Sequence, residues 1–231
     1  METSLHRELK ERYGPASGGR SEVPLDGYRI DAVAGDGVLV EIQSGALGPL
    51  RKKLESLLPS ARVRVVKPVV VARRLVRRAS QDGADLSARF SPKRGSLFDV
   101  FEDLIGVVCL FPHPNLEIEV LAVEIDEVRL TRRRRPGFSV VDRRLRSVVS
   151  SISLRSASDL WKLLPDRELW REPFTTREVS ERLGRSLHFA RRVAYCLRES
   201  GAARSLGKRG NLQVYARAKK GDILVFGGDL G

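Results

Sequence analysis

The fold class is indicated most clearly by residues 28–43, YRIDAVAGDGVLVEIQ. Their pattern predicts two strands joined by a tight turn. Apolar residues recur at every second position in Tyr28–Val33 and in Val38–Gln43, which is the period of a half-buried strand. Gly35-Asp36-Gly37 predicts the turn between them, because glycine tolerates positive φ angles. Two neighbouring strands of one sheet are therefore expected here.

The segments on either side extend this strand pair into an α/β unit. Asp26-Gly27 is a strong hairpin signal, so another strand comes before it. An amphipathic stretch stopped by Pro59 predicts a helix, and the β-branched run after it predicts a strand. In chain order we expect a helix over 4–13, strands over 22–25, 28–33 and 38–43, a helix over 47–58 and a strand over 63–71. The predicted fold class is α/β, with a mixed sheet and the element order αβββαβ.

The middle of the chain carries a basic hairpin and a predicted boundary. Residues 72–95 predict a hairpin that turns at Asp82-Gly83, followed by a helix over 96–110 and one long strand or a strand pair over 116–130. The arginine tract 132–135, ended by Pro136-Gly137, is the expected boundary. The chain then divides into a first domain over 1–135 and a second over 136–231, in which linker helices precede a C-terminal module.

The stretch from Phe174 onward predicts helix, tight turn, helix and hairpin. Thr175 and Glu178 have the spacing of a capping box, Gly184 ends the first helix and Ser186 can cap the second. The second helix, 187–200, has an apolar stripe on one side. Its other side carries four polar or aromatic residues: His188, Arg191, Arg192 and Tyr195. Two strands then follow, joined by a tip that contains Lys208 and Arg209.

This C-terminal part resembles the winged helix-turn-helix domains, a small α+β fold, over about 60 residues. The resemblance implies that the second helix, through its four outward residues, enters the major groove of DNA. It also implies that the hairpin tip contacts backbone phosphate. Two other interpretations stay open: many winged helices mediate protein contacts, and an arginine pair can simply form a solvated face.

The charge of the chain points to a polyanionic partner. It has 42 Lys and Arg against 29 Asp and Glu, a net charge of +13. Residues 166–220 hold 14 basic and 6 acidic residues, so +8 of that excess lies there. Nucleic acid is the usual partner of so basic a surface. The alternative is that arginine is frequent because the source genome is rich in G and C.

Asp31 and Glu41 form a carboxylate pair on the two strands quoted above. Asp31 ends one apolar strand, and alternation puts Glu41 and Gln43 on one face of the next. Two carboxylates with a polar group two residues on suit a divalent cation, which lowers the pKa of a bound water and shields an attacked phosphate. Such an all-oxygen site favours Mg²⁺. Both acids could equally be solvated residues at a sheet edge.

With the helices before and after them, these residues resemble the PD-(D/E)xK phosphodiesterase superfamily, which has a restriction-endonuclease-like fold. The resemblance covers roughly residues 4–71. It implies that Asp31 and Glu41 coordinate Mg²⁺ or Mn²⁺, and that Glu8 matches an additional acidic residue of the resolvase and archaeal-nuclease branches. In the family a Lys two residues after the Glu positions the attacking water.

This chain departs from the family pattern at Gln43, which takes the place of the Lys. Gln43 can hydrogen-bond a water but carries no positive charge. The missing charge could come from Lys52 or Lys53 on the following helix, or from Lys67 on the fourth strand.

The expected function is a metal-dependent DNA endonuclease that a winged helix guides to duplex or branched DNA. The alternative is a non-catalytic DNA-binding or regulatory protein on a nuclease-like scaffold. RNA as substrate and a homodimer stay open. Two cysteines far apart, a polar N-terminus and the lack of a long apolar run predict a cytoplasmic protein with no membrane partner and no structural zinc.

Overall fold

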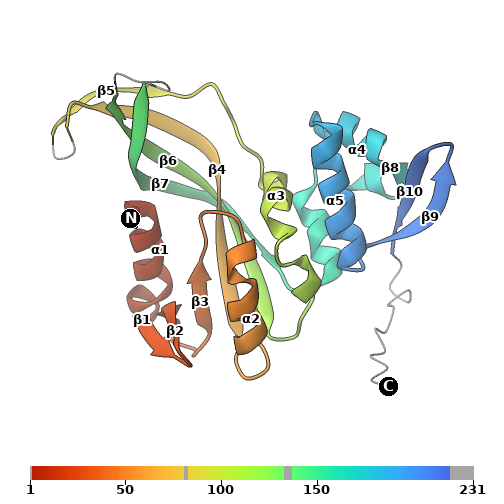
Figure 1. Ribbon diagram of the computed structural model, residues 1–231, viewed down its shortest axis with the longest axis horizontal. Coiled ribbons are helices and arrows are strands. Elements are labelled where there is room, and N and C mark those ends of the chain that lie inside the picture. Colours follow the sequence, from red (N-terminus) through yellow and green to blue (C-terminus); the bar gives the residue numbers. More distant parts are fainter. Residues whose placement is uncertain (1, 81–82, 133–136, 219–231) are drawn as a thin grey trace.

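The computed structural model describes residues 2–80, 83–132 and 137–218, and it is built on one long mixed sheet of seven strands (Figure 1). The elements of the first part of the chain are α1 (Ser4–Tyr13), β1 (Arg20–Leu25), β2 (Tyr28–Val33), β3 (Leu39–Ile42), α2 (Arg51–Leu57), β4 (Val63–Arg78), β5 (Asp85–Phe90), α3 (Phe101–Leu104), β6 (Leu116–Thr131) and β7 (Phe138–Leu154). The order αβββαβ expected for residues 4–71 is confirmed.

The strands lie in the order β1-β2-β3-β4-β6-β7, and β5 pairs with the far half of β4. The strand β4 is parallel to β3 on one side and to β6 on the other, whereas the remaining pairs are antiparallel. The sheet is therefore mixed, as expected.

Each face of the sheet is covered by its own helices. On one face, Leu5 and Leu9 of α1 pack with Val40 and Ile42 of β3 in a small core cluster. The opposite face packs against α2, α3 and the C-terminal helices in a larger cluster. Because alternate residues of β3 and β4 feed the two clusters, the strands are apolar on both sides. Among the described residues, every helix is too short or too polar to cross a membrane.

Three segments differ from the sequence-based expectation. The strand β4 continues to Arg78 instead of ending at residue 71, because β5 and β6 both pair with its second half. These strands form the expected basic hairpin, although Asp82 of its turn lies outside the described residues. The expected helix over 96–110 is broken into α3 and two 3₁₀ turns (Leu97–Val100 and Val108–Leu110). The break accompanies a backbone approach so close that a Cβ on Gly106 would lie 2.4 Å from the Gly48 nitrogen.

The third difference is at the expected boundary. Residues 138–154 form β7, not linker helices, and β7 pairs with β6 along its length with three register shifts. The sheet therefore continues past residue 135. Most of the arginine tract 132–135 lies outside the described residues. Short 3₁₀ helices follow β7 at Ala157–Leu163 and Arg167–Trp170.

The C-terminal module has the expected helices and hairpin. Its elements are β8 (Phe174–Thr175), α4 (Thr176–Leu183), α5 (Leu187–Glu199), β9 (Ala203–Arg209) and β10 (Leu212–Arg217). The capping box is present, since Thr175 Oγ1 accepts from the Glu178 amide at 3.3 Å and Glu178 Oε2 accepts from the Thr175 amide at 2.5 Å. Gly184, at φ 58°, ends α4 in the left-handed conformation that glycine tolerates.

The module packs directly on the sheet domain. The Phe98 and Phe189 rings lie 6.0 Å apart, and Arg185 Nη2 is 2.8 Å from Asp99 Oδ1. The same core cluster runs from Ile30 in β2 to Ala203 in β9. The two parts thus share one hydrophobic core.

The capping box of α4 makes a testable contribution to stability. Thr175→Val keeps the side-chain shape but leaves the Glu178 amide without its acceptor, so the free energy of unfolding should fall by about 1–2 kcal/mol. Chemical unfolding followed by circular dichroism measures this. Thr176→Val is the matched control, because the Thr176 hydroxyl makes no hydrogen bond to a described residue. Equal losses in the two variants would contradict the capping role.

Candidate active site and nucleic-acid interface

Asp31 and Glu41 lie opposite each other on adjacent strands. The β2–β3 register pairs Ala32 with Val40, so the next residues outward are these two acids. Asp31 Oδ2 accepts from the Ile42 amide at 2.8 Å, and Glu41 Oε1 lies 3.4 Å from the Asp31 amide nitrogen. Each carboxylate thus contacts the backbone of the other's strand, which confirms that the two side chains meet on neighbouring strands.

Lys53 of α2 is the lysine that pairs with Glu41. Its Nζ lies 2.5 Å from Glu41 Oε1 and donates to the Arg29 carbonyl at 2.6 Å. Lys53 projects from α2, on the element that follows β3. Lys52 is exposed on the same helix and makes no ion pair to a described residue. Of the two helix lysines, only Lys53 reaches the carboxylates.

Lys67 has a different position. It is 2% exposed, and its Nζ donates to the carbonyls of Ser44 and Gly45 and pairs with Asp103 at 2.9 Å. Burial lowers the pKa of Lys67, against the opposing pull of the Asp103 carboxylate. Lys67 therefore fixes the loop after β3 and is not the ion-pair partner of Glu41.

Gln43 lies just beyond β3 in that loop. Its Nε2 donates to the Ala46 carbonyl at 2.9 Å. The strand was expected to include residue 43, but it ends at Ile42, where its ladder with β4 also ends. The Gln43 side chain still borders the cavity beside Asp31.

The helix α1 contributes two basic side chains that the sequence analysis did not single out. His6 Nε2 lies 3.3 Å and Lys10 Nζ 3.7 Å from Asp31 Oδ1. Lys10 also pairs with Glu2 at 2.8 Å and with Glu22. The spacing of His6 and Lys10, one helical turn, was the available signal, since such residues share a helix face.

Glu8 does not join this group, contrary to its matching with the family's additional acid. It is exposed and does not line the cavity. At about 100° per residue, position 8 falls on the side of α1 opposite His6 and Lys10. The acids that do reach the cavity from this end of the chain are Glu2 and Glu22.

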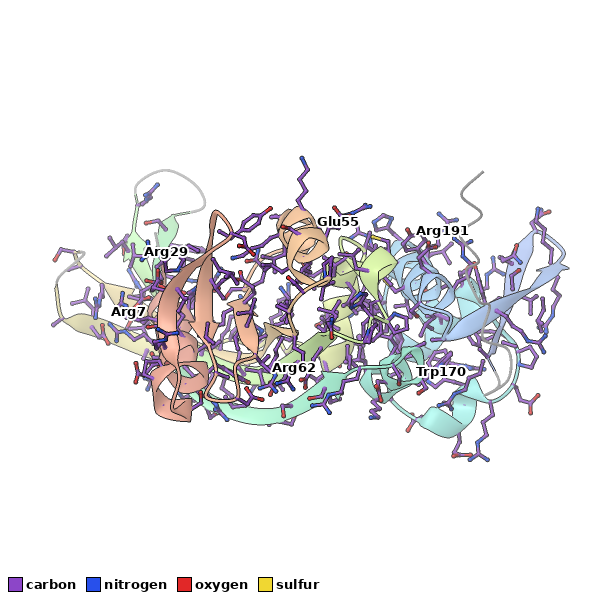
Figure 2. The ribbon with its side chains drawn as sticks, turned by 90° about the horizontal axis from the view of Figure 1, so that it is seen from below. Arg7, Arg29, Glu55, Arg62, Trp170 and Arg191 are labelled. Atoms are coloured by element: carbon purple, nitrogen blue, oxygen red, sulfur yellow. The ribbon has the colours of Figure 1, made fainter. Side chains whose placement is uncertain are left out.

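Asp31, Gln43 and the α1 side chains His6 and Lys10 border a cavity of about 520 Å³. It is lined by Glu2, Thr3, His6, Lys10, Glu22, Arg29, Asp31, Gln43, Ser44 and Gly45. The Ser44 Oγ atom is buried without a hydrogen-bond partner among the described residues. Figure 2 labels Arg29, which lies on β2, the strand that also carries Asp31. The cavity is therefore lined largely by charged and polar side chains, which suit a polar ligand.

The two carboxyl groups have pKa values shifted in opposite directions. Burial is the largest influence on Glu41 and raises its pKa; the Lys53 ammonium opposes this only in part, and the Asp31 charge adds to it. Burial also acts on Asp31, but hydrogen bonds from His6 and the Ile42 amide, together with the charges of His6 and Lys10, lower its pKa overall. Asp31 is the more strongly ionised member of the pair.

The donor chemistry fits one kind of metal. Within the described ranges, no three His, Cys, Asp or Glu residues converge as metal ligands. Mg²⁺ requires fewer protein ligands, because it keeps several waters and is held by one or two carboxylates and the substrate's phosphate. Asp31 and Glu41 fit that smaller set, and oxygen ligands suit Mn²⁺ as well.

The outer face of α5 is only partly free. His188, Arg191 and Tyr195 are exposed, and Figure 2 places Arg191 on the same side of the molecule as Glu55 of α2. Arg192, expected beside them, instead pairs with Glu102 of α3. The reason is the packing of the module on the sheet domain, which the sequence of α5 alone does not reveal.

The hairpin tip projects as expected. Lys208 and Arg209 are exposed at the end of β9, where Gly207 and Gly210 adopt positive φ angles of 102° and 61°. Arg209 Nη1 lies 3.8 Å from Glu178 Oε1, whereas Lys208 makes no ion pair to a described residue. Of the two basic residues at this tip, Lys208 is therefore the one without an ion-pair partner among the described residues.

The chain belongs to a family described as a domain of unknown function (DUF8091), whose model matches residues 3–155. This segment ends one residue after β7, so it contains the whole large sheet. The chain is also 34% identical over 226 residues to a protein of Treponema pallidum (strain Nichols) whose printed name is "Uncharacterized protein"; the alignment covers 96% of this chain and 87% of that one. No solved structure matches the chain.

The pairing of Lys53 with Glu41 predicts a titration shift. In Lys53→Met the ammonium is gone, while burial and the Asp31 charge remain, so the pKa of Glu41 should rise further. Carboxyl ¹³C NMR across a pH series measures it. Lys52→Met, the same change one residue away, should leave the titration of Glu41 as in the parent. If both variants titrated like the parent, the assigned ion pair would be wrong.

Proposed function

We propose that this protein is a metal-dependent DNA endonuclease. The observation that carries the proposal is the placement of Asp31 and Glu41 on neighbouring strands, with Lys53 paired to Glu41 and with Asp31 lining a polar cavity of about 520 Å³. These are the residue types of the PD-(D/E)xK superfamily, with the Lys brought by α2 instead of by the strand. The element order αβββαβ supports a restriction-endonuclease-like core around them.

Each side chain has a defined part in phosphodiester hydrolysis. Asp31 and Glu41 would hold Mg²⁺ or Mn²⁺, which when bound makes a water more acidic and neutralises charge on the phosphate. Lys53, beside Glu41, supplies a positive charge where the phosphate gains negative charge. His6 and Lys10 orient Asp31 through its Oδ1 atom. Gln43, at the rim, can hydrogen-bond a water or a phosphate oxygen.

The C-terminal module would bring DNA to this site. Its arrangement of α4, α5 and the β9–β10 hairpin supports a winged helix-turn-helix assignment, and residues 166–220 carry a net charge of +8. His188, Arg191 and Tyr195 form the groove-reading face in this proposal, and Lys208 and Arg209 contact phosphate. Because the module shares a core with the sheet domain, the two would act as one body.

A second candidate is a DNA-binding protein without catalysis. It is favoured by the ion pairing itself: His6, Lys10 and Lys53 already compensate both carboxylates, so Asp31 and Glu41 are satisfied without a metal. Buried acids paired in this way also occur as structural groups. Cleavage assays separate the two candidates.

The cleavage experiment compares four variants at equal DNA occupancy. Glu41→Gln removes a metal ligand and Lys53→Met removes the charge beside it, so each should lower the rate of plasmid or branched-DNA cleavage about 10²-fold or more. Lys52→Met is the control and should cleave like the parent. Gln43→Lys should leave the rate unchanged, because Lys53 already supplies the charge.

Reactions run with Mg²⁺ or Mn²⁺ and, in parallel, with EDTA. Cleavage that survives EDTA, or that Glu41→Gln leaves intact, would remove the metal site from consideration. If the parent is inert on every DNA form while it still binds DNA, the non-catalytic candidate replaces the nuclease.

The binding experiment uses the two neighbouring arginines of α5. Arg191→Ala should weaken duplex binding strongly, whereas Arg192→Ala should weaken it less, because Arg192 is already paired with Glu102. Lys208→Ala should lower the salt dependence by about one unit without changing sequence preference. Fluorescence anisotropy at several salt concentrations gives all three values. Equal losses for Arg191 and Arg192 would contradict the assigned face.

A further inference from the structure

The far halves of β4, β6 and β7, together with β5, extend beyond the helices as an arm, which we define as residues 72–78, 85–90, 124–131 and 138–147. Figure 1 shows the arm projecting away from α3 and the C-terminal module. Every residue of β5 is exposed, including Leu86 at 63% and Phe90 at 55%. Residues such as Val76 and Val128 of the arm are buried, whereas large apolar side chains of β5 stay exposed and call for a functional explanation.

A second cavity, of about 230 Å³, lies on the arm. Side chains from four strands line it: Leu75, Arg77, Ser87, Ala88, Arg89, Arg129, Thr131, Gly137 and Phe138. The register pairs Leu75 with Arg89 and Arg77 with both Ser87 and Arg129. These residues therefore share one face of the sheet.

That face is the one covered by α1. On β6, Ile125 packs in the cluster around α1, and alternation carries the same face to Glu127 and Arg129. The N-terminal end of α1 contacts the arm directly, since Asp142 accepts from the amide and hydroxyl of Ser4 at 2.8 and 2.7 Å. The arm cavity and the α1 residues of the candidate active site thus lie on the same side of the sheet.

The lining combines three guanidinium groups with an apolar floor and includes no acid. Arg77 donates weakly to Thr131 Oγ1 at 3.4 Å, and neither Arg77 nor Arg89 makes an ion pair to any residue within the described ranges. Two positive charges are therefore available to a ligand. An anion is the complementary group.

Arg129 is held in place from two sides. Its Nε donates to Glu127 Oε1 at 2.7 Å, and its guanidinium carbon lies 3.8 Å from the centroid of the Phe138 ring. The pair therefore places a planar guanidinium group over an aromatic ring. Nucleic-acid proteins use such arginine planes and aromatic rings as platforms for unpaired bases.

We propose that the arm cavity binds one unpaired nucleotide of a DNA strand. Its base would lie on the Arg129–Phe138 platform, and its phosphate would be taken by Arg77 and Arg89. The volume supports a single unit, because about 230 Å³ is below the roughly 300–1,000 Å³ of pockets for larger ligands. A fully paired duplex offers phosphates but no free base, so it cannot fill the floor of the cavity.

This proposal deepens the proposed function, on which it rests, by naming the substrate as DNA that contains an unpaired segment. Lys67 lies beside the end of β3, and Arg77 lies ten residues further along β4. The distance between these two residues along the strand is at most about 33 Å. One turn of duplex is about 34 Å. An unpaired nucleotide in the arm would therefore lie within about one turn of the bond at the candidate active site.

The test measures DNA binding in a Glu41→Gln background, so that cleavage does not interfere. The probes are a duplex and the same duplex with a short gap, one 2-aminopurine being placed in the gap. We expect the gapped probe to bind more tightly and its emission to be quenched by stacking. Arg77→Ala combined with Arg89→Ala should weaken gapped binding roughly tenfold, and Phe138→Leu should remove the quenching.

The matched control is Arg12→Ala combined with Arg20→Ala, which removes the same charge from exposed positions outside the arm. It should weaken both probes slightly and equally. The proposal is overturned if the arm variant binds the gapped probe like the parent, or if it weakens both probes to the same extent, which would indicate phosphate contact alone. Discrimination by the arm without any cleavage by the parent would instead refute the nuclease and keep the nucleotide site.

Discussion

The parallel pairing of β4 with β6 is the interaction on which the rest of the structure depends. It runs from Val63 with Leu116 to Arg78 with Leu130, with one register shift between Val70 and Ala72. The near half carries β3 and the candidate active site, and the far half carries β5 and the arm. Because one continuous ladder spans both, a disturbance of this pairing would reach the carboxylates and the arm together. Parallel strands of this kind need cover on both faces, and the helices cover the near half more fully than the far half.

The candidate site depends on a balance between burial and charge. Glu41 is 3% exposed, and an unpaired carboxylate at that depth would be costly. Lys53 compensates it, and His6 and Lys10 compensate Asp31, so the acids can stay close together before any metal or DNA arrives. In the proposed function, the same three basic side chains would contact the phosphates of a DNA strand. The compensation that stabilises the fold and the chemistry proposed for the site thus use the same groups.

The shared core makes the C-terminal module part of this arrangement. Phe98 and Phe189 join the two parts through apolar contact, while Arg185 with Asp99 and Arg192 with Glu102 fix their orientation. An arginine used in this way is less available to DNA. The proposed interface is therefore narrower on α5 than the helix sequence indicates. In our proposals, the hairpin tip and the arm add further DNA contacts outside α5.

The sequence by itself determined the local elements. Strand alternation, Asp26-Gly27 and the capping box of α4 depend on neighbouring residues, so the order αβββαβ and the position of Asp31 and Glu41 could be predicted. Which lysine meets Glu41, the outward direction of Glu8, the role of His6 and the pairing of Arg192 depend on contacts between elements far apart in the chain. The continuation of the sheet through β7 was missed for the same reason, since a partly exposed strand has no clear alternation without its partner. Tertiary packing alone decided these, because it sets which side chains approach each other and which are buried.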